Sequence, residues 1–585
     1  MDTRSYSLRH LLPYLGKYRT KMAIGFAMVL LTVISGMCAP WVLKYVVDDL
    51  KAAFSRDKLI VYATLILGIA ATEGFFRFWM RKILIGVSRD IEFDLRNDFL
   101  AHLQRMSLSF FQTRNTGDIM SRATNDLNAV RSVLGPGIMY SVTTLITVLI
   151  ATAILLRINW QLTLLAYVPL GLASFTVKRV GQQIHDRFEK IQAQFSEIST
   201  KAQENLSGIR IVKAFAREDS EIREFKQLNE EYVRRSVSLI RLWGIFYPLM
   251  SALIGMSAAV LLWLGGRQVI LGKLSLGEFV AFIGYLTMLT WPTIAIGWVI
   301  NIFQRGSASM ERILRIMEIT PDIADAPDAT APGRRDGSLE IRNLSFSYPG
   351  SPRAALQKLD INLPAGQVLA VVGHTGSGKS TLLNLIPRLY DPPPGTVYVD
   401  GKDVREWPLA DLRGMIGYVP QETFLFSDTI LENIAFGRSR PMTVEEAQAA
   451  AHASHVAQDI DAFPQKYDTF VGERGITLSG GQKQRVAISR AVAVEPRIMI
   501  LDDALSNVDT YTEERILGNL TEVARGRTVI LVSHRISTVK NADQIVVLKD
   551  GIIVERGSHA QLMEMQGAYA ELHRKQLLEE ELATA

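Results

Sequence analysis

The chain has 585 residues, a formal net charge of +5 and a mean hydropathy of +0.14, although 21% of its residues are charged. This length and mixture exclude a single compact domain and indicate an apolar half joined to a soluble half. The modest charge does not favour nucleic-acid binding, and the single cysteine, Cys38, excludes an intrachain disulfide and a cysteine-based metal site.

The first half contains apolar stretches long enough to cross a membrane as helices. A helix needs about 20 apolar residues to cross a hydrocarbon core. A sixth span is predicted at Leu59–Thr72, which is shorter and is followed by Glu73 and Arg77. A buried amphipathic helix is the alternative there, but an even number of spans returns the chain to its side of entry. The five clear runs without a charged residue are 22–43, 132–156, 158–177, 242–266 and 279–304.

Basic residues set the expected orientation. Because cytoplasmic flanks carry the excess of Lys and Arg, both termini and the soluble half are expected in the cytoplasm. No small-residue cleavage site accompanies the first span, so an uncleaved anchor is expected rather than a signal peptide. The flanking residues before the first span and after the last are Arg9, Lys17, Arg19, Lys21, Arg305 and Arg312.

Two connections between spans, 81–131 and 178–241, are much longer than the others and lie on the cytoplasmic side. Their apolar residues recur at spacings of three and four, which predicts helices that continue past the bilayer and turn back. We expect them to contact the soluble half near 110–126 and 204–216. From spacing alone, a plain helical hairpin is the alternative.

The second half alternates strands and helices. Residues 321–338 are rich in Pro, Ala, Asp, Gly and Arg without an apolar period, which predicts a linker. The linker divides a transmembrane domain, 1–320, from a second domain, 339–575. The tail, 576–585, is expected to be a frayed helix end.

A short apolar strand, 368–372, runs into a loop of the form G-x4-G-K-S. Between a strand and a helix, such a loop turns its backbone N–H groups toward phosphate oxygens, and the helix adds its positive end. Lys379 is predicted to neutralise the phosphates, and the Ser380 hydroxyl to bind Mg²⁺. The expected nucleotide-binding residues are Gly373, His374, Thr375, Gly376, Ser377, Gly378, Lys379, Ser380 and Thr381.

Two further motifs lie about 100 to 120 residues downstream of this loop. The apolar strand 497–502 ends in Asp502, a carboxylate suited to hold the Mg²⁺ shell. An LSGGQ tract precedes it, and its glycine N–H groups at a helix start form an anion receptor with no phosphate of its own. Its predicted nucleotide-binding residues are Ser479, Gly480, Gly481 and Gln482.

In this order the motifs resemble an ATP-binding cassette over about 339–570, and nearly the whole chain is similar to half-transporters among the type I (type IV fold) exporters. The resemblance implies a six-transmembrane-helix all-α domain with long intracellular helical loops, followed by an α/β P-loop nucleotide-binding domain. It implies ATP and Mg²⁺ as cofactors. It also implies a second half-transporter as partner, since each ATP lies between the phosphate loop of one chain and the LSGGQ tract of the other.

The resemblance also implies roles for single residues. Tyr348 is expected to stack on adenine, Gln421 to bind Mg²⁺ and sense the helical loops, and His534 to contact the γ-phosphate. The segment 469–475 matches an exporter-type loop, and Asp509 is expected in the loop that crosses to the other site.

Asp503 departs from the pattern, because the family usually has a glutamate there that polarises the attacking water. Aspartate is one methylene shorter, which retracts the carboxylate by roughly 1.5 Å, and such a misplacement can lower a rate on the order of 100-fold. Asp503, His534 and Gln421 are the predicted catalytic residues. The substitution favours a heterodimer in which this chain carries an impaired site, and a homodimer is the alternative.

These features lead to the hypothesis of ATP-driven export of amphipathic drugs or lipids across a bacterial inner membrane. An ATP-gated channel or regulatory subunit is a second class, which ATP-independent conductance would support. A soluble cassette acting on DNA or ribosomes is opposed by the six spans. Six side chains are candidates for contact with cargo and fit membrane packing equally well: Glu73, Arg77, Trp243, Tyr247, Trp291 and Trp298.

Overall fold

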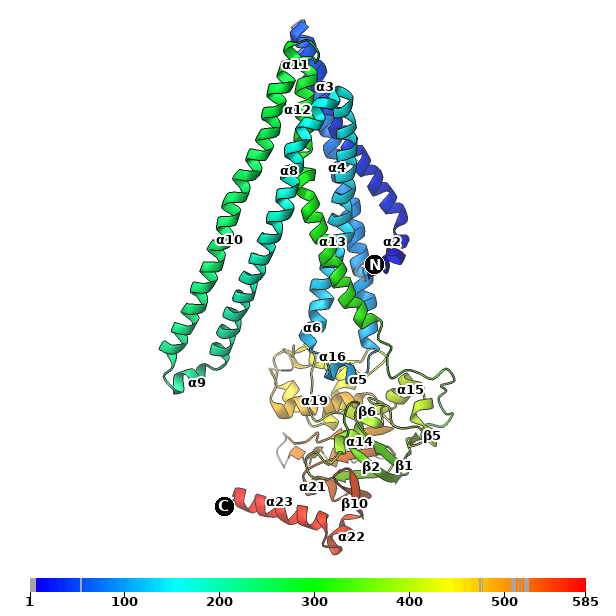
Figure 1. Cartoon of the computed structure of the whole chain (residues 1–585). Helices are drawn as coiled ribbons and strands as arrows, with labels where there is room; N and C mark the ends of the chain where they lie inside the picture. Colours follow the sequence, from blue (N-terminus) through cyan, green and yellow to red (C-terminus); the bar gives the residue numbers. More distant parts are fainter. Residues whose placement is uncertain are drawn as a thin grey trace. The chain divides into compact units, whose positions relative to one another are not determined.

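The chain forms two compact units, coloured along the sequence in Figure 1. Met1–Gln104 and Thr116–Ile319 make up the first unit, and Arg105–Asn115 and Thr320–Ala585 the second. The short segment 105–115 therefore belongs to the second unit, although the chain on both sides of it belongs to the first. This computed structural model describes residues 7–52, 55–472, 475, 477–506, 512–513, 515–516, 518–519 and 526–584.

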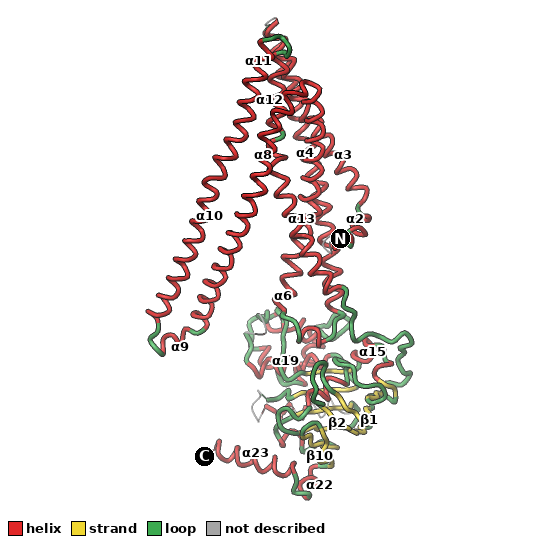
Figure 2. The backbone as a smooth tube through the Cα atoms, viewed as in Figure 1, coloured by secondary structure: helices red, strands yellow, loops and turns green. Residues whose placement is uncertain are grey.

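The first unit is built from helices, and its described residues contain no strand (Figure 2). Pro40, Pro169 and Pro248 lie inside its helices without ending them, which membrane helices tolerate when neighbouring groups satisfy the freed carbonyls. Its helices are α2 (Leu12–Lys17), α3 (Arg19–Ala52), α4 (Arg56–Gln104), α6 (Thr116–Ser121), α7 (Leu127–Ser132), α8 (Ile138–Ser207), α9 (Ile209–Ala214), α10 (Glu218–Val260), α11 (Gly266–Ile270), α12 (Leu276–Met288) and α13 (Thr290–Met317), with π-helical turns η1 (Arg122–Asp126), η2 (Val133–Gly137) and η3 (Leu261–Gly265).

Helix α8 turns back on itself at Asn159, whose backbone (φ −160°, ψ 106°) is not helical. The hydroxyls of Thr152 and Tyr167 lie 2.5 Å apart, whereas residues that far apart in a straight helix would be separated by about 22 Å. The Asn159 side chain holds the turn, because its Oδ1 accepts from the Leu162 N–H at 3.0 Å. Two apolar arms therefore run antiparallel on either side of Asn159.

This turn bears on the number of membrane spans. Five continuous helical stretches among the described residues are long and apolar enough to cross a membrane, and one of them, 116–207, contains the turn at Asn159. Dividing that stretch at the turn gives six apolar arms. The predicted architecture, a helical membrane domain followed by an α/β domain, is confirmed.

A ladder of polar contacts joins the start of the chain to α4. Three aspartates one helical turn apart on α4 meet partners from α2, α3 and the residue between them. The contacts are Lys21 to Asp90 at 2.9 Å, Lys17 and Tyr18 to Asp94 at 2.7 and 3.0 Å, and Tyr14 to Asp98 at 2.6 Å. Beyond the ladder α3 and α4 pack closely, and a Cβ on Gly25 would lie within 2.8 Å of Leu84 Cγ.

The second unit contains two sheets. The smaller is antiparallel with the order β2-β1-β4-β5, and the larger has the order β10-β9-β3-β8-β7-β6, parallel except for β10. β7 and β8 are buried at every position, which explains why they read as unbroken apolar runs. The strands are β1 (Leu339–Phe346), β2 (Leu356–Leu363), β3 (Val368–Val372), β4 (Val397–Val399), β5 (Lys402–Asp403), β6 (Ile416–Val419), β7 (Ile498–Asp502), β8 (Thr528–Val532), β9 (Gln544–Lys549) and β10 (Ile552–Gly557).

The register of the larger sheet brings the ends of its central strands to one edge. Val532 at the end of β8 is paired with both Val371 on β3 and Asp502 on β7. The residues that follow these strands therefore emerge side by side, as parallel α/β sheets favour for ligand sites. The helices of this unit are α5 (Leu108–Gln112), α14 (Lys379–Leu385), α15 (Leu409–Gly414), α16 (Ile430–Ala435), α17 (Val444–Ala453), α18 (Ala457–Asp461), α19 (Gly480–Ala493), α21 (Ile536–Val539), α22 (His559–Glu564) and α23 (Ala568–Thr584), with 3₁₀ turns η4 (Val404–Glu406) and η5 (Lys466–Asp468).

Candidate functional site

The glycine-rich loop lies between β3 and α14. Gly378 takes a backbone φ of +104° directly before the helix, a conformation that glycine adopts without steric cost. Lys379 is 7% exposed, and its ammonium donates to the carbonyls of Gly373 and His374 at 2.8 and 2.9 Å. The loop thus curls around the lysine at the start of a helix, which is the geometry that cradles phosphates.

Eleven of the residues predicted from separate motifs line one cavity of about 290 Å³ beside this loop. Two lining residues, Ala355 and Val532, carry no motif. Predicted residues Gly373, His374 and Ser377 lie in the loop but do not line the cavity. The eleven are Tyr348, Thr375, Gly376, Gly378, Lys379, Ser380, Thr381, Gln421, Asp502, Asp503 and His534.

Burial shifts the pKa values of two charged groups in the cavity, Asp502 and Lys379. Asp502 is 3% exposed, and burial raises the pKa of its carboxyl, an effect that the Ser380 hydroxyl opposes. Burial lowers the pKa of Lys379, while Asp502 and Asp503 oppose that shift. A buried cation and two carboxylates on one cavity suit a substrate that carries both phosphate and a metal ion.

The oxygen donors of the cavity fit Mg²⁺. Ser380, Gln421 and Asp502 supply one hydroxyl, one amide and one carboxylate, all on the same cavity. Mg²⁺ in nucleotide sites keeps several waters and needs only one or two carboxylates besides the substrate phosphates. Among the described residues, no three His, Cys, Asp or Glu side chains are grouped so that they could hold a metal ion.

Asp503 and His534 both line the cavity, and their side chains are too far apart for a hydrogen bond. The His534 Nε2 and the Asp503 Oδ2 are 4.0 Å apart. The Asp503 backbone has a φ of +47°, and its N–H donates to the Val532 carbonyl at 3.0 Å. Because this bond holds the Asp503 backbone, the reach of the carboxylate into the cavity depends on the length of its short side chain.

Tyr348 is the first of the predicted site residues along the sequence, and it lies just after β1. Its hydroxyl donates to or accepts from Thr381 on α14 at 2.9 Å. Its ring meets the rings of Phe346 and Tyr390 edge to face, with centroids 5.3 and 5.1 Å away. The ring is therefore fixed beside the loop, where it is available to stack on a base.

The LSGGQ tract starts α19. Ser479 and Gln482 cap the helix reciprocally, since the Ser479 Oγ accepts from the Gln482 N–H at 3.2 Å and the Gln482 Oε1 accepts from the Ser479 N–H at 3.0 Å. Gln482 also donates to Asp459 at 3.0 Å. Ser479, Gly480, Gly481 and Gln482 are not among the residues that line the cavity beside the phosphate loop.

Sequence reasoning missed several polar contacts around the site. Glu513 is 1% exposed and pairs with Arg535 and with the Thr538 hydroxyl. Nothing in the sequence distinguishes this carboxylate from the other charged residues near it. The predicted Asp509, and Glu473 and Arg474 in the 469–475 loop, lie outside the residues that the structure describes.

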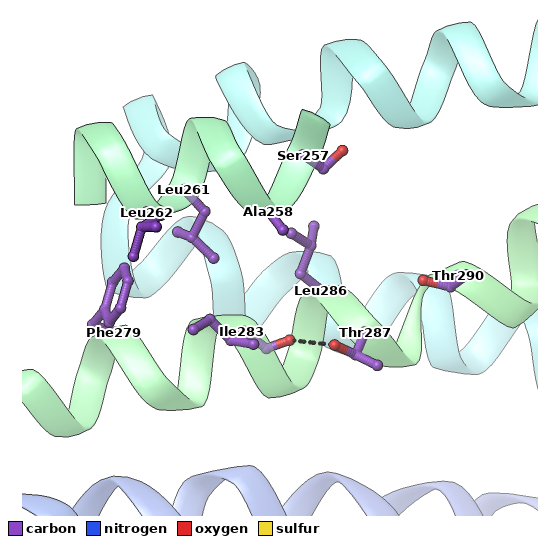
Figure 3. Close-up of a pocket in the computed structure, with 9 residues that line it drawn as sticks. All are labelled: Ser257, Ala258, Leu261, Leu262, Phe279, Ile283, Leu286, Thr287 and Thr290. Carbon is purple, nitrogen blue, oxygen red and sulfur yellow. Dashed lines mark hydrogen bonds between the residues drawn. The ribbon is translucent and has the colours of Figure 1, made fainter. Parts of the chain in front are cut away.

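The first unit contains an apolar pocket of about 250 Å³ (Figure 3). Side chains of α10 and η3 face those of α12 across it, with Thr290 of α13 at one end. None of the six side chains proposed to contact cargo lines this pocket. Its lining is Ser257, Ala258, Leu261, Leu262, Phe279, Ile283, Leu286, Thr287 and Thr290.

Two family models match the chain. The model described as "ABC transporter transmembrane region" matches residues 22–293, and the model described as "ABC transporter" matches residues 356–506. Together they cover most of the helical unit and the part of the second unit that contains the phosphate loop, Gln421, Asp502 and Asp503.

Curated proteins and solved structures resemble the chain over nearly its full length. It is 36% identical to the "Probable multidrug resistance ABC transporter ATP-binding/permease protein YheI" of Bacillus subtilis, covering 96% of both chains. It is 37% identical to the "Multidrug resistance-like ATP-binding protein MdlA" of Escherichia coli (96% and 95% covered) and 35% identical to the "ATP-dependent lipid A-core flippase" of Syntrophus aciditrophicus (93% and 90%). The structure of a bacterial Atm1-family ABC exporter with ATP bound is 30% identical, with a TM-score of 0.78 and coverage of 96% and 98%.

Proposed function

This chain belongs to the ABC transporter family and couples ATP hydrolysis to transport, and on that premise we propose that it exports amphipathic drugs or lipids as one half of a dimer. The observation that carries the proposal is the single cavity on which the phosphate loop, Tyr348, Gln421, Asp502 and His534 meet. The names of the relatives, which include multidrug resistance proteins and a lipid A-core flippase, support the substrate classes.

In the catalytic cycle that we propose, the loop and Lys379 hold the phosphates of ATP, and Tyr348 stacks on the adenine. Ser380, Asp502 and Gln421 would hold Mg²⁺, which would supply neutralising positive charge for the phosphates. Asp503 orients the attacking water, and His534 donates to the γ-phosphate. Positioning and electrostatics of this kind account for most catalysis of phosphoryl transfer.

Two features support a dimer. The LSGGQ tract does not line the cavity beside its own phosphate loop, so a second chain is needed to bring such a tract to the nucleotide. Helix α9 joins the long arms α8 and α10, and it is followed by Phe215, which is 74% exposed, while Ile211 within it is 66% exposed. Apolar side chains of this size in a long cytoplasmic connection are suited to contact another subunit.

We further propose that the dimer is heteromeric and that this chain contributes the slower site. The backbone of Asp503 is held by its N–H bond to the Val532 carbonyl, and its short carboxylate lies 4.0 Å from His534. The helix cap of the LSGGQ tract is complete. The tract is therefore suited to bind the nucleotide that the partner's phosphate loop holds at the competent site. A homodimer with a slow but working Asp503 is the second candidate, favoured by the presence of His534 in the cavity.

The protein is an integral, multi-pass membrane protein. We propose that it lies in a bacterial inner membrane with both termini and the nucleotide-binding domain in the cytoplasm. The basic residues next to the first and last spans, such as Lys17, Lys21 and Arg305, support this orientation.

The first test is Mg-ATPase activity of the chain purified alone in lipid nanodiscs, beside Asp503→Glu and Lys379→Ala. The proposal expects low wild-type turnover, a rise on the order of 100-fold with Asp503→Glu, and no activity with Lys379→Ala. Rapid wild-type turnover that Lys379→Ala abolishes would remove the impaired-site heterodimer and leave the homodimer.

The second test addresses export. Inverted membrane vesicles containing the chain and its co-purified partner should accumulate a fluorescent amphipathic dye or flip a labelled phospholipid only with Mg-ATP. Vesicles with Lys379→Ala provide the background. ATP-independent conductance without accumulation would favour a channel instead.

A further inference from the structure

One face of α4 carries a groove of about 550 Å³ in the membrane unit. The volume is within the range of about 300–1,000 Å³ that small-ligand sites in proteins occupy. Four cationic side chains and no carboxylate line the groove, together with two glycines and two apolar side chains. The charged and apolar lining residues are Arg77, Phe78, Arg81, Lys82, Ile85 and Arg89.

A buried carboxylate at one end of the groove is shared by three arginines. Glu92 is 6% exposed, and Arg89 lies 3.0 Å from its carboxylate. Arg96 and Arg131 contact the same carboxylate at 2.7 and 3.4 Å. One negative charge does not neutralise three positive ones, so the groove keeps an excess of positive charge at this end.

Two other cations of the groove, Arg81 and Lys82, make no ion pair among the residues that the structure describes, and both side chains are exposed. Arg77 differs, because it pairs with Glu73 one helical turn away. A charged side chain in a membrane segment is costly to leave without a partner. We therefore expect Arg81 and Lys82 to meet an anion that this chain does not supply.

Contacts with α3 show which part of the membrane domain the groove occupies. A Cβ on Gly25 would lie 2.8 Å from Leu84 Cγ, and a Cβ on Gly36 would lie 3.4 Å from Glu73 Cδ. The two unpaired cations fall between Glu73 and Leu84 in the sequence, so they lie alongside the charge-free run 22–43 of α3. The groove is therefore next to the beginning of the first span.

Aromatic residues of α4 indicate the level of the membrane surface. The uncharged stretch of α4 ends at Thr72, and the exposed rings of Phe75, Phe78 and Trp79 follow it. The Lys82 Nζ lies 4.8 Å from the centroid of the Trp79 ring. Tryptophan is enriched where the hydrocarbon core meets the headgroups, which is also the level at which lipid phosphates lie.

We propose that the groove on α4 is a docking site for the phosphate headgroup of an anionic phospholipid from the leaflet in which the first span begins. Charge complementarity identifies this occupant, because guanidinium and ammonium groups bind phosphate and basic pockets on membrane helices bind anionic headgroups. Arg81 and Lys82 donate to the phosphate oxygens, and Arg89 adds positive charge. Phe78 and Ile85 contact the apolar part of the lipid.

This inference goes beyond the proposed function, because the site would hold a resident lipid whatever compound the transporter exports. A zwitterionic lipid fits the groove less well, since its own cation would meet the positive side chains. The headgroup of phosphatidylglycerol carries a net negative charge and therefore serves as the probe.

The test titrates the full chain in a neutral detergent with phosphatidylglycerol or phosphatidylcholine and counts the bound lipids by native mass spectrometry. Each Lys or Arg near an anionic headgroup raises affinity roughly fivefold. Arg81→Gln combined with Lys82→Gln should therefore raise the Kd of the tightest-bound phosphatidylglycerol about 25-fold. Tm and the binding of an ATP analogue should stay unchanged, and phosphatidylcholine should bind the wild type more weakly than phosphatidylglycerol.

Two control variants separate the groove from general charge effects. Arg157→Gln combined with Lys273→Gln removes the same two residue types from exposed positions at the other end of the spans, and it should keep the wild-type Kd. Arg81→Lys combined with Lys82→Arg keeps both charges and should shift the Kd by less than about fivefold, the effect of one whole charge.

Three results would overturn the inference: equally tight binding of the two lipids, an unchanged Kd in Arg81→Gln with Lys82→Gln, or an equal loss in Arg157→Gln with Lys273→Gln. Loss of the partner half-transporter with unchanged lipid binding would also overturn it, because the groove would then be an interface between subunits. Failure of the proposed function would appear instead as absent binding of the ATP analogue, which is measured on the same samples.

Discussion

Two glycines of the phosphate loop offer a sharp test of the site geometry. Gly376 and Gly378 both have positive φ, +82° and +104°, but only Gly378 is tightly surrounded. A Cβ on Gly378 would lie 2.8 Å from the Ala355 carbonyl oxygen and 2.7 Å from Leu356 Cδ2, whereas a Cβ on Gly376 would meet nothing within 4 Å. Alanine at these two neighbouring positions therefore separates backbone strain from steric contact.

The magnitudes follow from these contacts. In Gly376→Ala the only cost is the free energy of placing alanine in a left-handed backbone conformation, about 1–2 kcal/mol. In Gly378→Ala the rarer backbone conformation costs about 1–3 kcal/mol of free energy. Displacing a backbone carbonyl costs about 1–3 kcal/mol more, which gives roughly 2–6 kcal/mol together. Since 1.4 kcal/mol is tenfold in affinity, ATP binding should weaken about 5- to 30-fold in Gly376→Ala and at least about 30-fold in Gly378→Ala.

The assay is equilibrium binding of a fluorescent ATP analogue to each variant in nanodiscs. Thermal unfolding without nucleotide shows how much of the loss comes from general destabilisation. Equal losses in the two variants would refute the steric argument, and wild-type binding by Gly378→Ala would refute the described loop geometry.

Three other predictions concern charge, assembly and topology. Burial raises the pKa of Asp502, so the ionised carboxyl destabilises the nucleotide-free protein above that pKa. Asp502→Asn should therefore raise Tm by a few degrees at pH 8 without Mg-ATP, and this gain in Tm should disappear as the pH falls through the raised pKa. The same variant should abolish hydrolysis. Phe215→Ser should lower dye-stimulated ATPase of the assembled transporter several-fold while leaving Tm within about 2 °C, measured by scanning fluorimetry, because the side chain is exposed within this chain. In a Cys38→Ser background, Lys273→Cys should react with an impermeant maleimide from outside the cell and Lys213→Cys only after permeabilisation; the reverse pattern would refute the proposed orientation.

The sequence predicted the features that depend on neighbouring residues. Spans could be recognised because each is a continuous charge-free run, and the loop at 373–381 because its glycines, Lys379 and Ser380 are consecutive. The parallel register of β3, β7 and β8 then brought residues from distant motifs to one edge. The order of the motifs, taken with the family resemblance, was enough to expect that convergence.

Contacts between distant segments could not be predicted. Nothing near Gln112 or Tyr390 indicates that they meet across 278 positions, because that contact depends on how α5 packs in the second unit. The π-helical turns among the described residues were also not expected, since uncharged spans and spacings of three and four locate helices without fixing the number of residues in each turn. The 4.0 Å separation of Asp503 and His534 depends on backbone angles that the residue types do not specify.

The ladder between the start of the chain and α4 limits how these helices can move. Exposed ion pairs of this kind contribute little energy, but Asp90, Asp94 and Asp98 recur once per helical turn. A slide of α3 by a full turn would offer Lys17 and Lys21 new aspartate partners, so the ladder alone permits steps of about 5.4 Å. The close fit of Leu84 against Gly25 forbids that step, because the bulkier residues one turn away cannot take the place of the glycine. We therefore expect α3 and α4 to move together as one rigid body, and we expect any bending at the point where the chain leaves α4 for α5.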